Sequence, residues 1–156
     1  MPWIPDEFRP GLDALRDAAP AAAHAALTAA FAPMLQLPGD ARLSLVGVAE
    51  PDAAVLAGPG VPDRLRQMMD GATAQGVVGM VADIAGYSLR PWGFDPADVA
   101  AAVLLGYGAA DALVGVEHAH WYRSALPNAW LEIVPEVGHL VVVPFWAEAL
   151  THVLSA

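Results

Sequence analysis

Residues 101–111 read AAVLLGYGAAD, and residues 130–139 read WLEIVPEVGH. Each stretch opens on a mostly apolar run and continues into a loop that contains glycine. Such runs are typical of parallel strands, because both faces of a parallel sheet are covered. We therefore predict one strand at Ala101–Leu105, ended by Gly106 and Gly108, and a second strand at Trp130–Val134.

The segments around these two runs predict helices. An amphipathic stretch from Glu117 to Leu126 lies between the runs and is ended by Pro127 and Asn128. A further helical pattern extends from Pro144 to Leu154. Strand, helix, strand and helix in this order form a βαβα unit, so residues 91–156 predict an α/β fold with a small parallel sheet.

The preceding residues, 1–90, predict short helices separated by proline and glycine. Pro20 opens an alanine-rich helical stretch that reaches about Phe31, since proline is tolerated in a first helical turn. Another helical stretch begins at Asp63 after a loop at Ala57–Pro62. Residues Ala41–Val48 fit either a strand or a helix, because periodicity does not separate the two in so short a run. We expect no sheet within residues 1–90.

Composition excludes several classes of protein. The chain has 156 residues and a formal charge of -10, whereas a nucleic-acid partner or an anionic membrane surface requires a basic face. Without cysteine there is no disulfide framework, zinc-thiolate site or cysteine nucleophile, which fits a cytoplasmic location. Prolines interrupt the longest uncharged stretch, Ala18–Gly39, and the acidic N-terminus does not fit a targeting segment, so we expect no membrane association.

Two residues carry the strongest chemical signal. Asp111 follows the first predicted strand, and His139 follows the second. Loops at the carboxyl ends of neighbouring parallel strands lie side by side, so these two side chains can meet. An aspartate that accepts a hydrogen bond from one imidazole nitrogen leaves the other nitrogen free as a general base. For each residue alone, the simpler alternative is a structural role: Asp111 would close a turn, and His139 would cap a helix.

Two other sequence patterns suggest alternative sites. Gly106, Gly108 and Asp111 partly fit the dinucleotide fingerprint, with Glu136 as a ribose ligand, but an aspartate replaces the third glycine. His118 and His120 suggest a metal site, yet residues two apart on a helix point in different directions, which favours a solvated face. We therefore predict neither a cofactor nor a metal ion.

Four segments together resemble the C-terminal part of an α/β-hydrolase. They are the run Arg90–Asp95 (RPWGFD), the strand followed by Gly-x-Gly-x-x-Asp, the turn Leu126–Ala129 and the loop Gly138–Leu140. The resemblance implies that Asp111 is the acid and His139 the base of a catalytic triad. It also implies that residues 1–90 correspond to the lid, and that a complete relative cleaves esters, amides or related bonds of a small molecule without a cofactor.

The family's nucleophile elbow, Gly-x-Ser-x-Gly, is absent from the sequence. None of the four serines, Ser44, Ser88, Ser124 and Ser155, has glycine two residues before and two residues after it. We therefore expect a truncated hydrolase that has the acid and the base but is inactive alone. The alternative is a non-catalytic interaction module or one half of a split hydrolase; a weaker one recruits Ser88 as a substitute nucleophile.

The sequence also predicts association with another chain. In the family's strand order, the strand at Ala101–Leu105 would pair on its outer side with a strand that this chain lacks. No charged residue protects that edge between Val99 and Ala110. We expect a homo-oligomer or a complex with a complementary half-domain rather than a monomer.

Overall fold

The computed structural model describes residues 9–38, 41–43 and 48–155, which divide into two compact units. The first unit contains the described residues up to 43 and residues 63–94, and the second contains residues 48–62 and 95–155. Residues 48–62 lie within the predicted helical region 1–90 but group with the second unit, because Asp52 is hydrogen-bonded to the loop at 138–140.

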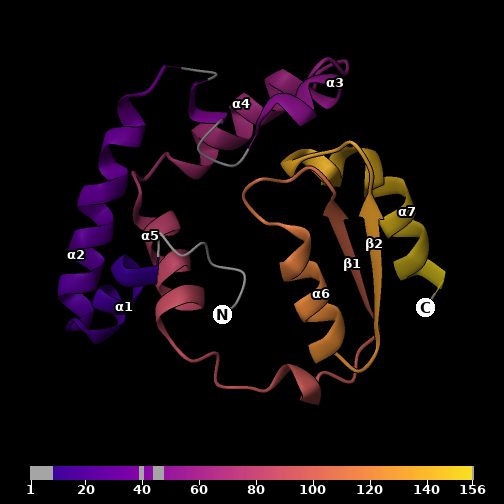
Figure 1. Ribbon diagram of the computed structural model, residues 1–156. Coiled ribbons are helices and arrows are strands. Elements are labelled where there is room, and N and C mark those ends of the chain that lie inside the picture. Colours follow the sequence, from indigo (N-terminus) through magenta and orange to yellow (C-terminus); the bar gives the residue numbers. More distant parts are fainter. Residues whose placement is uncertain (1–8, 39–40, 44–47, 156) are drawn as a thin grey trace. The chain divides into compact units, whose positions relative to one another are not determined.

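The first unit is helical in all the elements described for it (Figure 1). Its predicted alanine-rich helix is α2, Pro20–Phe31, with proline in the first turn as expected. The elements of this region are α1 (Arg9–Asp17), α2, η1 (Ala32–Gln36), α4 (Val61–Ala72), α5 (Val78–Ile84) and the π-helical turn η4 (Ala85–Leu89). No strand occurs in the described part of this unit, as predicted, and residues 41–43 form one helical turn. Residues 44–47 of the ambiguous run lie outside the described residues.

A small apolar core holds the first unit together. Leu27 of α2 packs with Val77 and Val81, and Val81 is fully buried. Leucine, phenylalanine and isoleucine side chains from α1, α2 and α5 surround this cluster. The guanidinium of Arg16 additionally donates two hydrogen bonds, of 3.0 and 2.8 Å, to the carbonyl of Ser88, which fixes α1 to η4.

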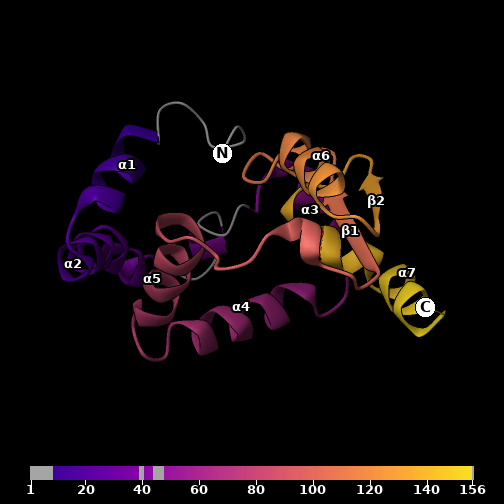
Figure 2. The same cartoon turned by 90° about the horizontal axis from the view of Figure 1, so that it is seen from below.

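The second unit contains the predicted parallel strands. Strand β1 (Val103–Gly108) pairs with β2 (Ala129–Val134) in a register that runs from Val103 opposite Ala129 to Gly108 opposite Val134. Helix α6 (Val116–Ala125) connects the strands and packs on both of them, while α7 (Val142–Ser155) follows β2 and packs on β1. Figures 1 and 2 show the two helices on opposite sides of the strand pair. The fold of this unit is therefore mixed α/β, in the predicted order.

Strand β1 differs from its prediction at both ends. It begins at Val103 and continues through Gly106 to Gly108, whereas we expected the glycines to end it. Glycine fits within the strand here because a neighbouring group occupies the space that a side chain would need. A Cβ atom on Gly106 would lie 2.5 Å from the ring of Phe145 on α7, so the glycine lets that helix pack closely.

Short elements complete the second unit. They are η3 (Glu50–Asp52), α3 (Ala53–Leu56), η5 (Pro96–Asp98) and η6 (His139–Val141). Several large apolar side chains on β2 and α7 are exposed, including Trp130 at 56% and Trp146 at 57%. Among the helices of the described residues, none combines the length and the apolar character that crossing a bilayer requires.

Candidate active site

The loops that follow β1 and β2 are hydrogen-bonded to each other. The N–H of Ala109 donates to the carbonyl of Val134 at 2.9 Å, and the N–H of Ala110 donates to that of Val137 at 3.0 Å. These bonds extend the pairing of the two strands beyond Gly108. They bring the segment before Asp111 next to the segment before His139, as the strand order predicted.

Asp111 is held in place by its own loop. Its Oδ1 atom accepts hydrogen bonds from the backbone N–H groups of Leu113, at 2.8 Å, and Val114, at 3.0 Å. An aspartate that binds the backbone two and three residues later stabilises a turn, and so it sets its own orientation. The side chain is only 6% exposed. The structural alternative for Asp111, closure of a turn, is therefore realised through one oxygen, while the other oxygen is left for another partner.

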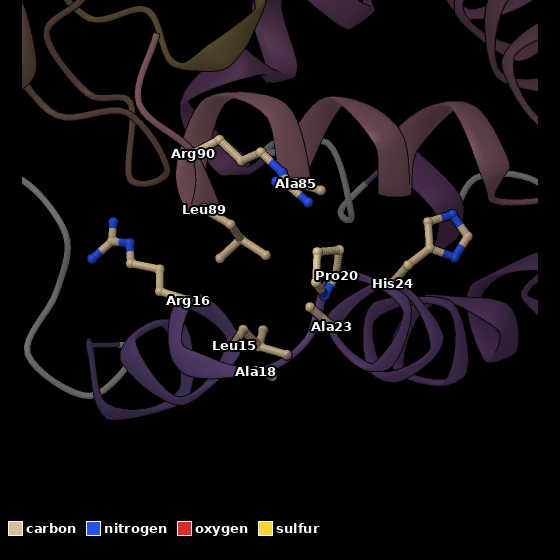
Figure 3. A pocket seen from close by; sticks show the side chains of 9 residues that line it. All are labelled: Leu15, Arg16, Ala18, Pro20, Ala23, His24, Ala85, Leu89 and Arg90. Atoms are coloured by element: carbon tan, nitrogen blue, oxygen red, sulfur yellow. The ribbon is translucent and has the colours of Figure 1, made fainter. Parts of the chain in front are cut away.

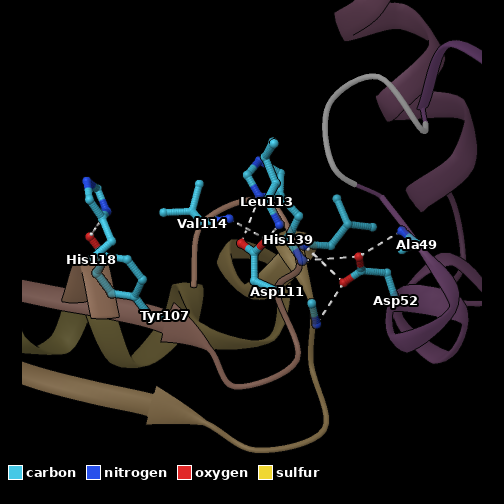
Figure 4. A network of polar contacts seen from close by, with 10 residues as sticks. Ala49, Asp52, Tyr107, Asp111, Leu113, Val114, His118 and His139 are labelled. Carbon is cyan, nitrogen blue, oxygen red and sulfur yellow. Dashed lines mark hydrogen bonds and ion pairs between the residues drawn. The ribbon is translucent and has the colours of Figure 1, made fainter. Parts of the chain in front are cut away.

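That second oxygen binds His139. The Oδ2 atom of Asp111 lies 2.8 Å from Nδ1 of the imidazole (Figure 4). An ionised carboxylate only accepts hydrogen bonds, so the proton on the neutral ring belongs on Nδ1. The Nε2 atom then carries a lone pair, and the side chain is 32% exposed. The structure thus brings together the two residues that the sequence singled out.

Glycine at two positions permits this approach of the loops. A Cβ atom on Gly108, the last residue of β1, would collide with the carbonyl oxygens of Val137 and Gly138. A Cβ atom on Gly138 would lie 2.6 Å from Oδ2 of Asp52. Any larger residue at either position would displace the loop that carries His139.

Asp52 is a residue of this site that the sequence analysis did not identify. Its side chain is completely buried, and its carboxylate accepts N–H groups from Gly138 at 3.1 Å, His139 at 3.1 Å and Leu140 at 3.0 Å. The N–H of Ala49 adds a fourth bond at 3.3 Å. A buried carboxylate is costly unless such donors compensate it. No local pattern could have revealed its link to the His139 loop, because those three partners lie 86 to 88 positions later in the chain.

The described serines do not complete a triad. Ser124 on α6 and Ser155 at the end of α7 each donate their hydroxyl to a carbonyl of their own helix, both at 2.7 Å. Ser88 lies in η4 of the first unit, where its carbonyl binds Arg16. Ser44 lies outside the described residues. Within the part of the chain that the structure describes, no hydrogen bond joins a serine hydroxyl to His139.

The geometry disfavours the dinucleotide alternative. A fingerprint loop requires a helix N-terminus directly after the glycines, where it can receive the pyrophosphate. Here the carboxylate of Asp111 already occupies the turn, and helix α6 does not begin until Val116.

His118 and His120, the two candidates for a metal site, lie in different environments. The Nδ1 atom of His118 is hydrogen-bonded to the hydroxyl of Tyr107 at 3.0 Å, and its ring meets Tyr122 edge-on. Burial lowers the pKa of His118 below its ordinary value. His118 is therefore partly packed between α6 and β1, whereas His120 is solvated as expected. In residues 9–38, 41–43 and 48–155, no three histidine, aspartate or glutamate side chains are grouped in a way that would hold a metal ion.

The first unit contains a separate cavity of about 240 Å³ (Figure 3). Its walls include the apolar side chains of Leu15 and Leu89 and the basic side chains of Arg16, His24 and Arg90. Neither Asp111 nor His139 lines it. Arg16 is already bonded to the carbonyl of Ser88 and to Asp13, so the cavity does not present a fully available cationic site.

Comparison of the chain with protein family models, with curated proteins and with solved structures found no match. The resemblance to α/β-hydrolases therefore depends on the motifs quoted above and stays a hypothesis.

Proposed function

We propose that the second unit supplies the acid and the base of a serine-hydrolase type of acyl transfer, and that a separate chain supplies the nucleophile. The observation that supports this proposal is the 2.8 Å contact between Asp111 and Nδ1 of His139, with Asp111 itself fixed by two backbone N–H groups. The side chain of Asp111 is 6% exposed, and both of its carboxylate oxygens are used, one by the two backbone N–H groups and the other by His139.

The proposed chemistry follows from the tautomer of His139. Its Nε2 atom takes the proton of an attacking hydroxyl, and the resulting imidazolium is stabilised by the carboxylate of Asp111. The same nitrogen then returns the proton to the leaving alcohol or amine as the tetrahedral intermediate collapses. Asp111 keeps its charge throughout and holds the ring in place. The substrate class is an ester, amide or related small molecule.

The unpaired side of β1 favours a complementary chain as the partner. Within the described residues, β1 pairs only with β2, so its other edge has no strand beside it. Such an edge is a template for a further strand. In the resembling family, the strand next to this edge belongs to the core that carries the nucleophile elbow, so a chain that pairs here would bring the serine toward His139.

The test measures hydrolysis of a panel of short activated esters. The chain alone should give no turnover above buffer, whereas the chain co-expressed with the reading frame encoded directly upstream should hydrolyse at least one ester. Asp111→Ala and His139→Ala should each lower that turnover by about 10⁴-fold, and His120→Ala, which alters an exposed histidine, should not.

Two results would contradict the proposal. Turnover by the isolated chain that is lost in both Asp111→Ala and His139→Ala would show that the nucleophile lies within it. Turnover by the co-expressed pair that survives His139→Ala would remove the base from the reaction. If the complex forms but hydrolyses nothing, the alternative of a non-catalytic interaction module is favoured.

A further inference from the structure

We propose that Asp52 is a positioning residue for His139: it fixes the backbone of the loop from which the imidazole projects. This inference rests on the proposed function, because it assigns Asp52 a role toward the general base. It is carried by a different set of contacts, since Asp52 binds the main chain of the loop whereas Asp111 binds the ring.

The contacts of Asp52 converge on three consecutive residues. Its Oδ1 atom accepts the N–H groups of Gly138 and Leu140, and its Oδ2 atom accepts the N–H of His139 (Figure 4). A single rigid carboxylate thereby orients three successive peptide groups. These peptide groups determine where the Cα and Cβ atoms of His139 lie, and so the distance from the ring to Asp111.

The loop needs this restraint because its backbone is irregular. Glu136 has a φ angle of 58°, in the left-handed region, and Gly138 has φ and ψ angles of -93° and -135°. The helical turn η6 begins only at His139. No regular element therefore fixes the residues just before the base, and the carboxylate of Asp52 takes that role.

The absence of a side chain at Gly138 leaves room for the carboxylate of Asp52. A Cβ atom there would lie 2.6 Å from Oδ2 and 2.9 Å from Oδ1 of Asp52. Glycine thus allows the carboxylate to reach the peptide groups directly. This pairing gives a second way to disturb the contact, by enlarging residue 138 while leaving the charge of Asp52 intact.

The experiment reads the tautomer of His139 from the ¹⁵N chemical shifts of its ring nitrogens, recorded on the whole chain with the ring neutral. In the wild type, the proton should reside on Nδ1. In Asp52→Asn, the loop loses an acceptor for its N–H groups, the ring moves away from Asp111, and the Nδ1–H form should lose its dominance. Glu50→Gln, a neighbouring exposed acid, should leave the tautomer unchanged.

The outcomes separate this inference from the proposed function. A wild-type ring protonated mainly on Nε2 would contradict the Asp111–His139 base itself. A wild-type Nδ1–H tautomer that persists unchanged in folded Asp52→Asn would overturn the role of Asp52 alone. If Asp52→Asn does not fold, Gly138→Ala decides by the same signal. Unfolding of both variants would make Asp52 a purely structural residue and overturn the positioning role.

Discussion

At the scale of single residues, the site depends on glycines that allow main chains to approach and on two carboxylates that bind the same loop. Asp111 and His139 could be predicted because each follows an apolar run, and parallel strands bring such positions together. Asp52 could not, because nothing near it in the sequence records a partner 86 to 88 residues away. The close approach of Gly108 to Val137 and Gly138 could not be predicted either, because a glycine at this position in the sequence is equally typical of the end of a strand.

Gly108→Ala should therefore destabilise the second unit. The added methyl group would overlap two carbonyl oxygens of the His139 loop, which are backbone atoms and cannot rotate away. We expect a loss of about 3 kcal/mol in the free energy of unfolding, as for overpacked sites. Chemical denaturation followed by circular dichroism measures it. Gly115→Ala is the control, because its methyl group would meet only the end of the Glu117 side chain; equal losses in the two variants would refute the explanation.

At the scale of elements, the sequence predicted β2, α6 and α7 to within two residues at each end, because apolar runs and helix-ending prolines mark them. The parallel pairing of the strands follows from the helix between them. The sequence did not reveal the short elements η3 and α3, which belong to the second unit although they lie between helices of the first in the chain. Their packing on the second unit depends on the hydrogen bonds from residues 138–140 to Asp52. These bonds join residues far apart in the sequence, so no periodic sequence pattern predicts them.

The packing of α6 on β1 predicts a dependence of stability on pH. Burial lowers the pKa of His118 below its ordinary value of about 6.5, while the unfolded chain keeps the ordinary value. As pH falls through that value, the unfolded state binds a proton that the folded state does not yet bind. Stability should therefore decrease from pH about 6.5 downward and be fully retained above it.

Comparison with His118→Gln isolates this effect from the other histidines. Urea unfolding of the two proteins should show a difference in stability that changes between neutral and mildly acidic pH, with the wild type losing more on acidification. Tyr107 and Tyr122 also contact this ring, but both keep their protons in this range, since burial raises the pKa of each hydroxyl above about 10. Parallel curves for the two proteins would contradict the assignment.

At the scale of the whole molecule, the chain combines a strong negative charge with exposed apolar side chains. Its formal charge is -10, yet Trp146 is 57% exposed and Leu154 is 84% exposed. The sequence predicts a helical region up to residue 90 and an α/β region after it, because the pattern of apolar residues changes there. It could not indicate that the part around Asp52 groups with the strands, because composition does not change there.

We expect the isolated chain to associate through the outer edge of β1. Light scattering coupled to size exclusion at micromolar concentration should give a mass of at least two chains. Val103→Lys, which places a charge at the start of β1, should shift that mass toward one chain, since charged residues protect sheet edges. A cooperatively folding wild-type monomer at the same concentration would refute this expectation.

The pairing of Asp111 with His139 is tested by the reaction of His139 with diethyl pyrocarbonate, mapped residue by residue with mass spectrometry. The reagent modifies imidazole nitrogens that carry a lone pair. We predict that His139 is modified, and that Asp111→Asn slows this reaction while leaving the exposed His120 unaffected. Modification of His139 at an unchanged rate in Asp111→Asn would contradict the claim that the two residues form a general base.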